Sequence, residues 1–166
     1  MMGCINGQCG VPDVGSVQVE FDLRGFKKLR DDAVIPKRAT KDSAGYDFYI
    51  PENAETVVLR PGETKIIGTG ICAYMAPTEY LDFRIRSGLS TKGLIFMNGS
   101  GVIDSDYYPR EIGAIMHNLS DQPITLAAGM KIAQGIFTQY LTVSNEALIT
   151  EERSGGFGST GGSING

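Results

Sequence analysis

Short runs in which hydrophobic and polar residues alternate dominate the chain from residue 17 onward. Between Leu81 and Arg86, for example, Leu, Phe and Ile alternate with Asp and two Arg. Such alternation predicts a β-strand with one buried face, because successive side chains of a strand point to opposite sides of the sheet. By pattern and by their bounding turn residues, further strands are predicted at 17–21, 47–50, 55–59, 64–74, 94–98, 101–103, 112–118, 123–127 and 131–141.

Turn-forming residues separate these runs, which sets the expected fold class. Proline fixes φ and glycine permits positive φ, so either residue favours a turn between two strands. No window of helical length has an apolar stripe of 3.6-residue period, although Ser87–Gly93 could form one short helical turn. Many short strands joined by turns predict an all-β jelly-roll-like sandwich or barrel.

Three segments of unequal character make up the chain. Residues 1–16 are rich in Gly, Cys and Asn without periodicity, and we interpret them as a loose N-terminal leader. Residues 17–150 carry the predicted strands and can bury a single core. Residues 151–166 are rich in glycine and lack an apolar pattern, so we expect a flexible C-terminal arm.

Composition and charge argue against several classes of protein. The net charge of −4 argues against a nucleic-acid binder, which would usually be basic. Three cysteines in no framework spacing, with a single histidine, His117, argue against a disulfide scaffold or a structural zinc site. The sequence contains neither an apolar run of membrane-spanning length nor a signal peptide. We therefore expect a soluble, cytoplasmic protein without a membrane partner.

Two internal stretches could carry chemistry. Arg86–Gly93 places a guanidinium, hydroxyls, an ammonium group and glycine backbone after a strand, which suits a phosphate cradle but also an ordinary polar connection. Asn98–Tyr107 leads an apolar pair into Asp104 and Asp106. A carboxylate at a strand end can act as a general base, whereas aspartates are also common in turns.

A third stretch lies in the C-terminal arm. Gly155–Gly161, with Arg153 just before it, could wrap phosphates with backbone N–H groups and hydroxyls, and Phe157 could stack on a base. Taken alone, the composition of the segment favours a disordered tail. It lacks the Gly-Lys-Ser/Thr of a Walker loop.

Together these stretches resemble the trimeric dUTPase family, whose five motifs are matched in order over about residues 34–161. Each motif alone is weakly specific, but five in order at suitable separations make coincidence a poor explanation. The matching segments are Ala39–Asp47, Arg86–Leu89, Gly101–Tyr107, Gly129–Gln134 and Arg153–Gly161.

The resemblance implies a jelly-roll homotrimer that hydrolyses dUTP to dUMP and pyrophosphate, with each active site built from all three subunits. By matched position, Asp104 would activate the attacking water. Tyr107 would stack under the deoxyribose and exclude a 2′-hydroxyl. Asn98 and the main chain of Gly101, Val102 and Ile103 would read the uracil edge.

The same resemblance implies which residues bind the phosphates and which residue contacts the metal ion. Asp47 would contact Mg²⁺ through water, with the ion held mainly by the triphosphate. The expected phosphate ligands are Arg86, Ser87, Gly88 and Gln134. The arm would close over the nucleotide through Arg153, Phe157, Gly158, Ser159 and Thr160.

Two departures from the family pattern are visible. One residue fewer separates Arg153 from the double glycine, which affects the reach of its side chain. The turn Tyr108–Glu111 is one residue longer than the common form and lies at the base-binding hairpin. We assign Asp106 no role beyond the turn.

Two other functions remain open alternatives. The related dCTP deaminases share the fold but carry a catalytic Glu where this chain has Ile115, and Glu111 lies too early in the sequence to replace it. A non-catalytic nucleotide-sensing trimer is the second alternative, against which the intact Asp104 argues.

Overall fold

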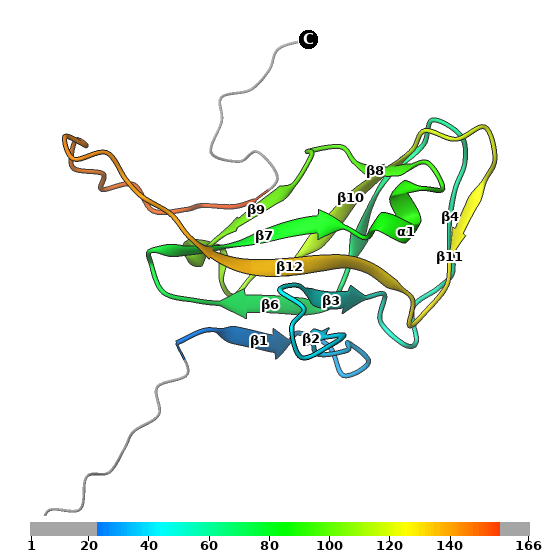
Figure 1. The fold of residues 1–166 in the computed structure, drawn as a ribbon, viewed down its shortest axis with the longest axis horizontal. Helices are drawn as coiled ribbons and strands as arrows, with labels where there is room; N and C mark the ends of the chain where they lie inside the picture. Colours follow the sequence, from blue (N-terminus) through cyan, green and yellow to red (C-terminus); the bar gives the residue numbers. More distant parts are fainter. Residues whose placement is uncertain (1–22, 157–166) are drawn as a thin grey trace, which may run out of the picture.

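The computed structural model describes residues 23–156, which form a β-sandwich of short strands (Figure 1). One helical turn and one 3-10 turn interrupt the strands of this part of the chain. The elements in chain order are β1 (Gly25–Lys28), β2 (Lys37–Arg38), β3 (Tyr46–Tyr49), β4 (Val57–Leu59), β5 (Thr64–Gly68), β6 (Ile71–Tyr74), β7 (Glu79–Ile85), α1 (Ser87–Ser90), β8 (Leu94–Phe96), β9 (Gly101–Asp104), η1 (Ser105–Tyr107), β10 (Gly113–Asn118), β11 (Ile124–Leu126) and β12 (Lys131–Gln139).

Two antiparallel sheets form the body of the molecule. The larger has the strand order β2-β3-β12-β7-β9, and the smaller has the order β5-β10-β8. Two-stranded pairs of β1 with β6 and of β11 with β4 complete the sandwich. This arrangement confirms the predicted all-β, jelly-roll-like class. Within residues 23–156, no helix is long and apolar enough to cross a membrane.

Aromatic side chains join the two sheets in the core. The Phe83 ring on β7 packs against Phe48 of its own sheet at 5.0 Å and against Phe96 of β8 at 5.4 Å between ring centroids. All three side chains are buried. Gly135 on β12 allows this packing, because a Cβ there would lie 2.8 Å from the Phe48 ring and 3.0 Å from Leu81. The inward residues of the alternating runs therefore form the core, as the pattern predicts.

The predicted strands are present wherever the structure describes them, with one division. The run 64–74 forms two strands, β5 and β6, because Gly70 turns the chain at φ 68°. Just before it, the Thr69 hydroxyl donates a hydrogen bond to the Ile112 carbonyl at 2.7 Å. The helical turn expected within Ser87–Gly93 is α1. The run 17–21 and the leader 1–16 lie outside the described residues.

Two short strands were missed by the sequence analysis. β1 has the sequence Gly-Phe-Lys-Lys, which does not alternate, and it is held by backbone pairing with β6. β2 is only two residues long and pairs with β3. Strands of this kind depend on their neighbours' hydrogen bonds, so their own side chains give little signal.

The chain leaves the sandwich after β12 and returns to it. Residues 140–150 form an irregular loop that projects from the body, and the segment that follows runs back beside β9 (Figure 1). Leu141 and Leu148 in the loop are almost fully exposed. This return places Arg153 next to the end of β9.

Asn118, at the end of β10, fixes the turn between β10 and β11. Its side chain is fully buried and donates to the carbonyls of Leu59 at 2.9 Å and Gln122 at 2.8 Å. Its Oδ1 accepts hydrogen bonds from the Ser120 amide and hydroxyl. Burial also removes this asparagine from any glycosylating enzyme in the folded protein, although its sequence matches the acceptor pattern.

Replacing Asn118 with Ala should lower the free energy of unfolding by about 2–4 kcal/mol, because two carbonyls, one amide and one hydroxyl would lose their partner. Urea denaturation at fixed protein concentration measures this. Asn53→Ala, at an exposed position, is the matched control and should change stability by less than about 0.5 kcal/mol. Equal losses for both variants would contradict a structural role for the Asn118 side chain.

Candidate active site

A cleft of about 490 Å³ lies beside β9 and the outer surface of the smaller sheet. Strands β5, β9 and β10, the hairpin before β9, η1 and the returning arm all contribute to it. Its lining residues are Ile66, Asn98, Gly101, Val102, Ile103, Tyr107, Gly113, Ile115, Arg153 and Gly156. Six of these ten residues were predicted from the sequence. A mainly apolar cleft with a few polar groups is the usual form of a small-molecule site.

The hairpin between β8 and β9 presents backbone groups to this cleft. Gly99 adopts a φ of 70°, and its amide donates to the Phe96 carbonyl at 3.0 Å, which closes the turn. The Asn98 side chain then lies close to Gly101, whose built Cβ would be 3.6 Å from Asn98 Nδ2. Gly101 therefore leaves the space between strand and amide open to a ligand.

Asp104 lies at the end of β9, next to the cleft. Pairing of β9 with β7 sets it opposite Tyr80 and directs the following residues into η1. The Asp104 side chain is 44% exposed, and its Oδ2 is paired with Arg153 Nη2. Arg153 Nε also donates to Asp106 Oδ1 at 2.7 Å. One guanidinium thus connects both carboxylates of the segment.

Tyr107 forms part of the cleft wall and carries the returning arm. Its hydroxyl donates to the Glu111 carbonyl at 3.0 Å. Burial raises the pKa of the Tyr107 phenol above its ordinary value, so the ring stays neutral at physiological pH. The Arg153 guanidinium lies 5.9 Å from the ring centre. A Cβ on Gly156 would approach the ring to 2.6 Å, so the arm passes the ring closely at this residue.

The predicted phosphate and metal residues form a second group at another part of the chain. Asp47 on β3 is buried, and its carboxylate lies 3.3 Å from Arg86 Nη1 and 2.9 Å from Lys131 Nζ. Gln134 on β12 pairs in register with Asp47. Ser87 and Gly88 follow Arg86 in α1, and the space above Gly88 is open. The structure therefore brings together the matched residues of three motifs.

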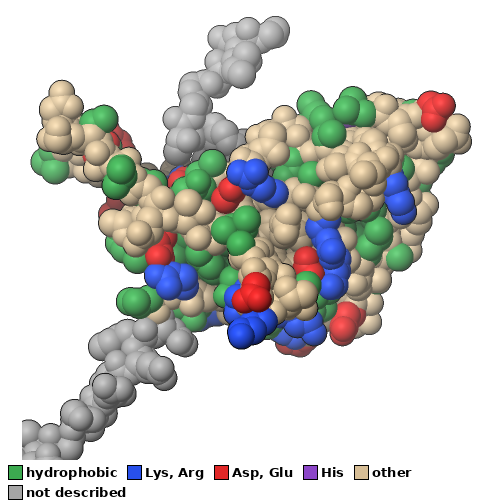
Figure 2. All heavy atoms as spheres, viewed as in Figure 1, with side chains coloured by type: hydrophobic (Ala, Val, Ile, Leu, Met, Phe, Trp, Pro, Cys, Tyr) green, Lys and Arg blue, Asp and Glu red, His purple; other side chains and the backbone are tan. Residues whose placement is uncertain are grey.

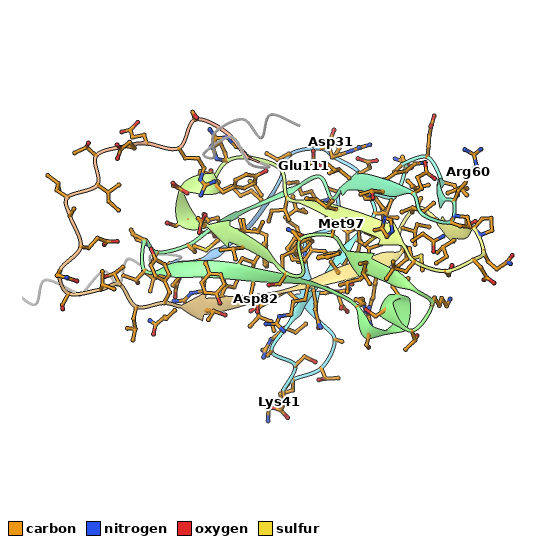
Figure 3. All side chains as sticks on the ribbon, turned by 90° about the horizontal axis from the view of Figure 1, so that it is seen from above. Asp31, Lys41, Arg60, Asp82, Met97 and Glu111 are labelled. Carbon is orange, nitrogen blue, oxygen red and sulfur yellow. The ribbon has the colours of Figure 1, made fainter. Side chains whose placement is uncertain are left out.

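Basic residues surround this second group. On the face seen in Figure 2, Lys and Arg side chains gather in front of the larger sheet, with a few acidic side chains among them. The loop 39–45 projects from the same sheet, with Lys41 at its outer end (Figure 3). A surface of this kind suits a polyanionic ligand despite the negative net charge.

Strand β7 separates the two groups within one chain. Arg86 follows its last residue, whereas Asp104 pairs with Tyr80 near its beginning. Six residues of extended chain span roughly 20 Å. The predicted base and the predicted phosphate ligand Arg86 therefore do not meet within a single subunit.

Asp47 fits a water-mediated contact with Mg²⁺. Its Oδ2 is buried and accepts no hydrogen bond within the described residues, although the Lys131 ammonium lies near it. Lys131 and Asp47 thus form an ion pair without a well-directed hydrogen bond. Mg²⁺ commonly keeps several waters and binds through one or two carboxylates together with substrate phosphates. Residues 23–156 contain no cluster of three or more side chains able to form a protein-only metal cage.

Some cleft residues were missed by the sequence analysis, and one of them bears on the deaminase alternative. Ile115 occupies an outward position of β10 and lines the cleft with Ile66. An apolar residue at an outward position of a strand is the sequence feature that could have indicated this role. Glu111 does not line the cleft, and its Oε1 accepts a hydrogen bond from the Gly70 amide at 2.6 Å. Figure 3 shows Glu111 on the side of the molecule opposite Asp82.

The turn Tyr108–Glu111 lies apart from the cleft lining. Tyr108 packs its ring against Tyr74, and its hydroxyl accepts a hydrogen bond from Lys27 at 3.0 Å. With Glu151–Arg153, the turn also borders a second, more open groove. The turn therefore packs toward β1, and the expectation that it lies at the base-binding hairpin is wrong. Phe157, Gly158, Ser159 and Thr160 lie outside the described residues.

Comparison with known proteins places these features in a family. The dUTPase family model matches residues 31–161. A deoxyuridine 5'-triphosphate nucleotidohydrolase of Lactococcus lactis is 43% identical over 150 residues, which cover 84% of this chain and 98% of the relative. The crystal structure of dUTPase from Streptococcus mutans is similar with a TM-score of 0.65 and 37% identity, over 73% of this chain and 99% of that one. A Staphylococcus bacteriophage 80alpha dUTPase solved with dUPNHPP is 25% identical, with a TM-score of 0.66 over 85% and 99% of the two chains. With its five motifs in order and this extent of similarity, the chain belongs to the dUTPase family.

Proposed function

We propose that this protein hydrolyses dUTP to dUMP and pyrophosphate, with Asp104 as the general base. The observation that carries the proposal is the position of Asp104 beside an apolar cleft that Tyr107 and the β9 backbone line. In the cell, this reaction would keep uracil out of DNA and supply dUMP for thymidylate synthesis. A cytoplasmic location is part of the same proposal.

The chemistry requires one proton transfer and one displacement. Asp104 accepts a proton from water, and the water oxygen forms a bond to the α-phosphorus. The bond from that phosphorus to the bridging oxygen breaks, and pyrophosphate leaves. Such a reaction depends mostly on positioning and on neutralising the phosphate charge, which suits a site with one carboxylate base and several cations.

The cleft gives a physical basis for choosing uracil. The backbone of Gly101–Ile103 and the amide of Asn98 can pair with the edge of the base, while Ile66 and Ile115 exclude water around it. Fixed donors and acceptors reject a base with different groups more strongly than apolar contact alone does. Tyr107 offers a flat face for the deoxyribose, with no added space for a 2′-hydroxyl.

Mg²⁺ is the cofactor in this proposal. The triphosphate would hold the ion, and Asp47 would reach it through a water molecule. When bound, Mg²⁺ neutralises charge on the phosphate oxygens. Arg86, Ser87, Gly88 and Gln134 orient the phosphates, and Lys131, which lies next to Asp47, adds a cation.

The arm completes the nucleotide site in this proposal. Arg153, which already lies beside Asp104, would bind the phosphates. Phe157, Gly158, Ser159 and Thr160 would cover the nucleotide and exclude bulk water.

We further propose that the active form is a homotrimer with shared sites. The separation of Asp104 from Arg86 along β7 supports this, because one chain alone does not bring base and phosphate ligand together. Exposed apolar residues also support it: Ile66, Met97 and Val102 are each more than half exposed, close to the cleft. Surface of this kind commonly lies at an interface between subunits.

Incubation with dUTP and Mg²⁺ should yield dUMP and pyrophosphate, whereas dCTP, dTTP and UTP should be poor substrates. Asp104→Asn should lower kcat by roughly 10²–10⁴ while keeping affinity for a non-hydrolysable dUTP analogue, because only the base is lost. Product identification by chromatography and analogue binding by calorimetry measure the two effects.

Three outcomes would overturn parts of this proposal. Release of dUDP and phosphate would place the attack on another phosphorus. Ammonia release from dCTP would support the deaminase alternative. Nucleotide binding without turnover would favour the sensing trimer.

Mixing two inactive variants tests the shared site. Arg86→Ala and Asp104→Asn should each be inactive, yet refolding them together should restore activity in about a quarter of the sites, where an intact Asp104 meets an intact Arg86 from another subunit. A mixture of Asp104→Asn with Asp104→Ala is the matched control and should stay inactive. Mixed oligomers that remain inactive would show that the two residues act within one subunit.

The ion pairs of Asp47 with Arg86 and Lys131 lead to a separate prediction. Asp47→Asn removes the negative charge between Arg86 and Lys131, so stability should fall by about 1–2 kcal/mol, a modest value because both cations are partly exposed to solvent. Inorganic pyrophosphate should raise the Tm of this variant more than that of the unaltered protein. Asp121→Asn, at an exposed turn, is the control. Equal Tm shifts in all three proteins would mean that these cations do not bind phosphate.

A further inference from the structure

Arg84 is a basic residue of β7 that lies outside the five family motifs but on the same face of the larger sheet as the proposed phosphate ligands. It pairs directly with Gln134 on β12, and Gln134 pairs with Asp47 on β3. Residues directly opposite each other on antiparallel strands share one face, with their Cβ atoms roughly 5 Å apart. Arg86, two residues further along the extended chain, lies on this face too. Arg84 therefore extends the row of proposed ligands by one strand.

Asp82 holds the Arg84 side chain in one orientation. Its Oδ2 accepts a hydrogen bond from Arg84 Nε at 2.7 Å and lies 2.7 Å from Nη2. The Asp82 side chain is only 12% exposed, and its cross-strand neighbours are the apolar Val102 and Ile136. Arg84 is therefore the group that compensates this poorly hydrated charge. Both contacts use the Nε side of the guanidinium, so Nη1 is directed away from the carboxylate.

The outer end of the Arg84 side chain is open to a ligand. The side chain is 58% exposed, compared with 35% for Arg86. Its neighbour Gln134 leans toward β3, because a Cβ on Gly45 would lie 2.8 Å from Gln134 Oε1. Figure 3 shows Asp82, the partner of Arg84, on the side of the molecule from which the loop 39–45 projects. The guanidinium thus combines a fixed orientation with access from this face.

We propose that Arg84 is an additional substrate-binding residue that contacts the phosphate chain of the nucleotide. The inference rests on the proposed function, because it adds a residue to the same site. A guanidinium binds phosphate oxygens through directed N–H groups. Pairing with Asp82 orients these groups before the ligand arrives, so less conformational entropy is lost on binding. A phosphate held by Arg86 and Gln134 meets Arg84 directly beside it.

Calorimetry with inorganic pyrophosphate tests this contact without catalysis. Arg84→Ala should weaken pyrophosphate binding by roughly three- to tenfold. Arg84→Lys keeps the charge but loses the planar fork, so its affinity should fall between those of Arg84→Ala and the unaltered protein.

A double variant separates the contact from two other effects of the substitution. Asp82→Ala combined with Arg84→Ala leaves no unpaired carboxylate and keeps the net charge of the protein. It should still bind pyrophosphate roughly three- to tenfold more weakly than the unaltered protein. Such a loss would report the missing contact, because neither a buried charge nor the overall charge would explain it.

Arg60→Ala is the matched control, because it also removes one exposed arginine. Figure 3 shows Arg60 at one end of the molecule, apart from Asp82. Its substitution should change pyrophosphate affinity by less than roughly twofold, since salt screens charges that are distant from the ligand. Deoxyuridine, which has no phosphate, should bind equally well to all variants. Light scattering should show the same oligomeric state for each of them.

Kinetics with dUTP and Mg²⁺ give a second measure. Arg84→Ala should raise KM by roughly three- to tenfold with a smaller change in kcat, because the lost contact already exists in the bound substrate. Arg60→Ala should leave both constants unchanged.

The possible results separate this inference from the function on which it rests. Unchanged pyrophosphate affinity in Arg84→Ala, or normal affinity in the double variant, would overturn the inference, because Arg84 would then only compensate Asp82. Weaker deoxyuridine binding or a smaller assembly would also overturn it, since the substitution would then disturb the whole site. If the unaltered protein binds pyrophosphate but does not hydrolyse dUTP, the proposed function fails, while the pyrophosphate measurements still decide the role of Arg84.

Discussion

The length of β7 determines where this chain can carry out chemistry. An extended strand cannot shorten without losing its ladder of hydrogen bonds, and β7 is paired on both sides, with β12 and with β9. Phe83 at its centre also packs both sheets together. The ends of β7 are therefore held apart by the most heavily packed part of the fold. The proposed base and the proposed phosphate ligands lie at these opposite ends, so the proposed self-association would supply what the single chain lacks.

The two ends differ in their physical character. Around Asp104, the cleft is largely apolar, and its polar groups are backbone atoms and a few side chains. Around Asp47, charged groups crowd together and partly neutralise one another. A nucleotide has the same division between a weakly polar base and a highly charged triphosphate. The apolar cleft is complementary to the base of a nucleotide, and the charged group around Asp47 is complementary to its triphosphate.

Sequence patterns predicted much of this fold because the core depends on local alternation. The run from Leu81 to Arg86 identified β7, and the Asp104 segment was recognised from its family motif. Long-range geometry was not predictable in the same way. Nothing near Asp106 in the sequence indicates Arg153 as its partner, and β1 is a strand only because β6 pairs with it. The cleft residue Ile66 was likewise missed, since its role depends on register between β5 and β10.

The side chain at Ile115 bears on how readily this protein could acquire the related chemistry. In the genetic code, no single base change converts an isoleucine codon into a glutamate codon. On a path to glutamate, the first amino-acid change places valine, lysine, asparagine or methionine at this position. Valine would leave the cleft apolar, and lysine would place a cation on its wall, next to Ile66. None of these residues carries a carboxylate, so selection for deamination would gain nothing from the first amino-acid change alone.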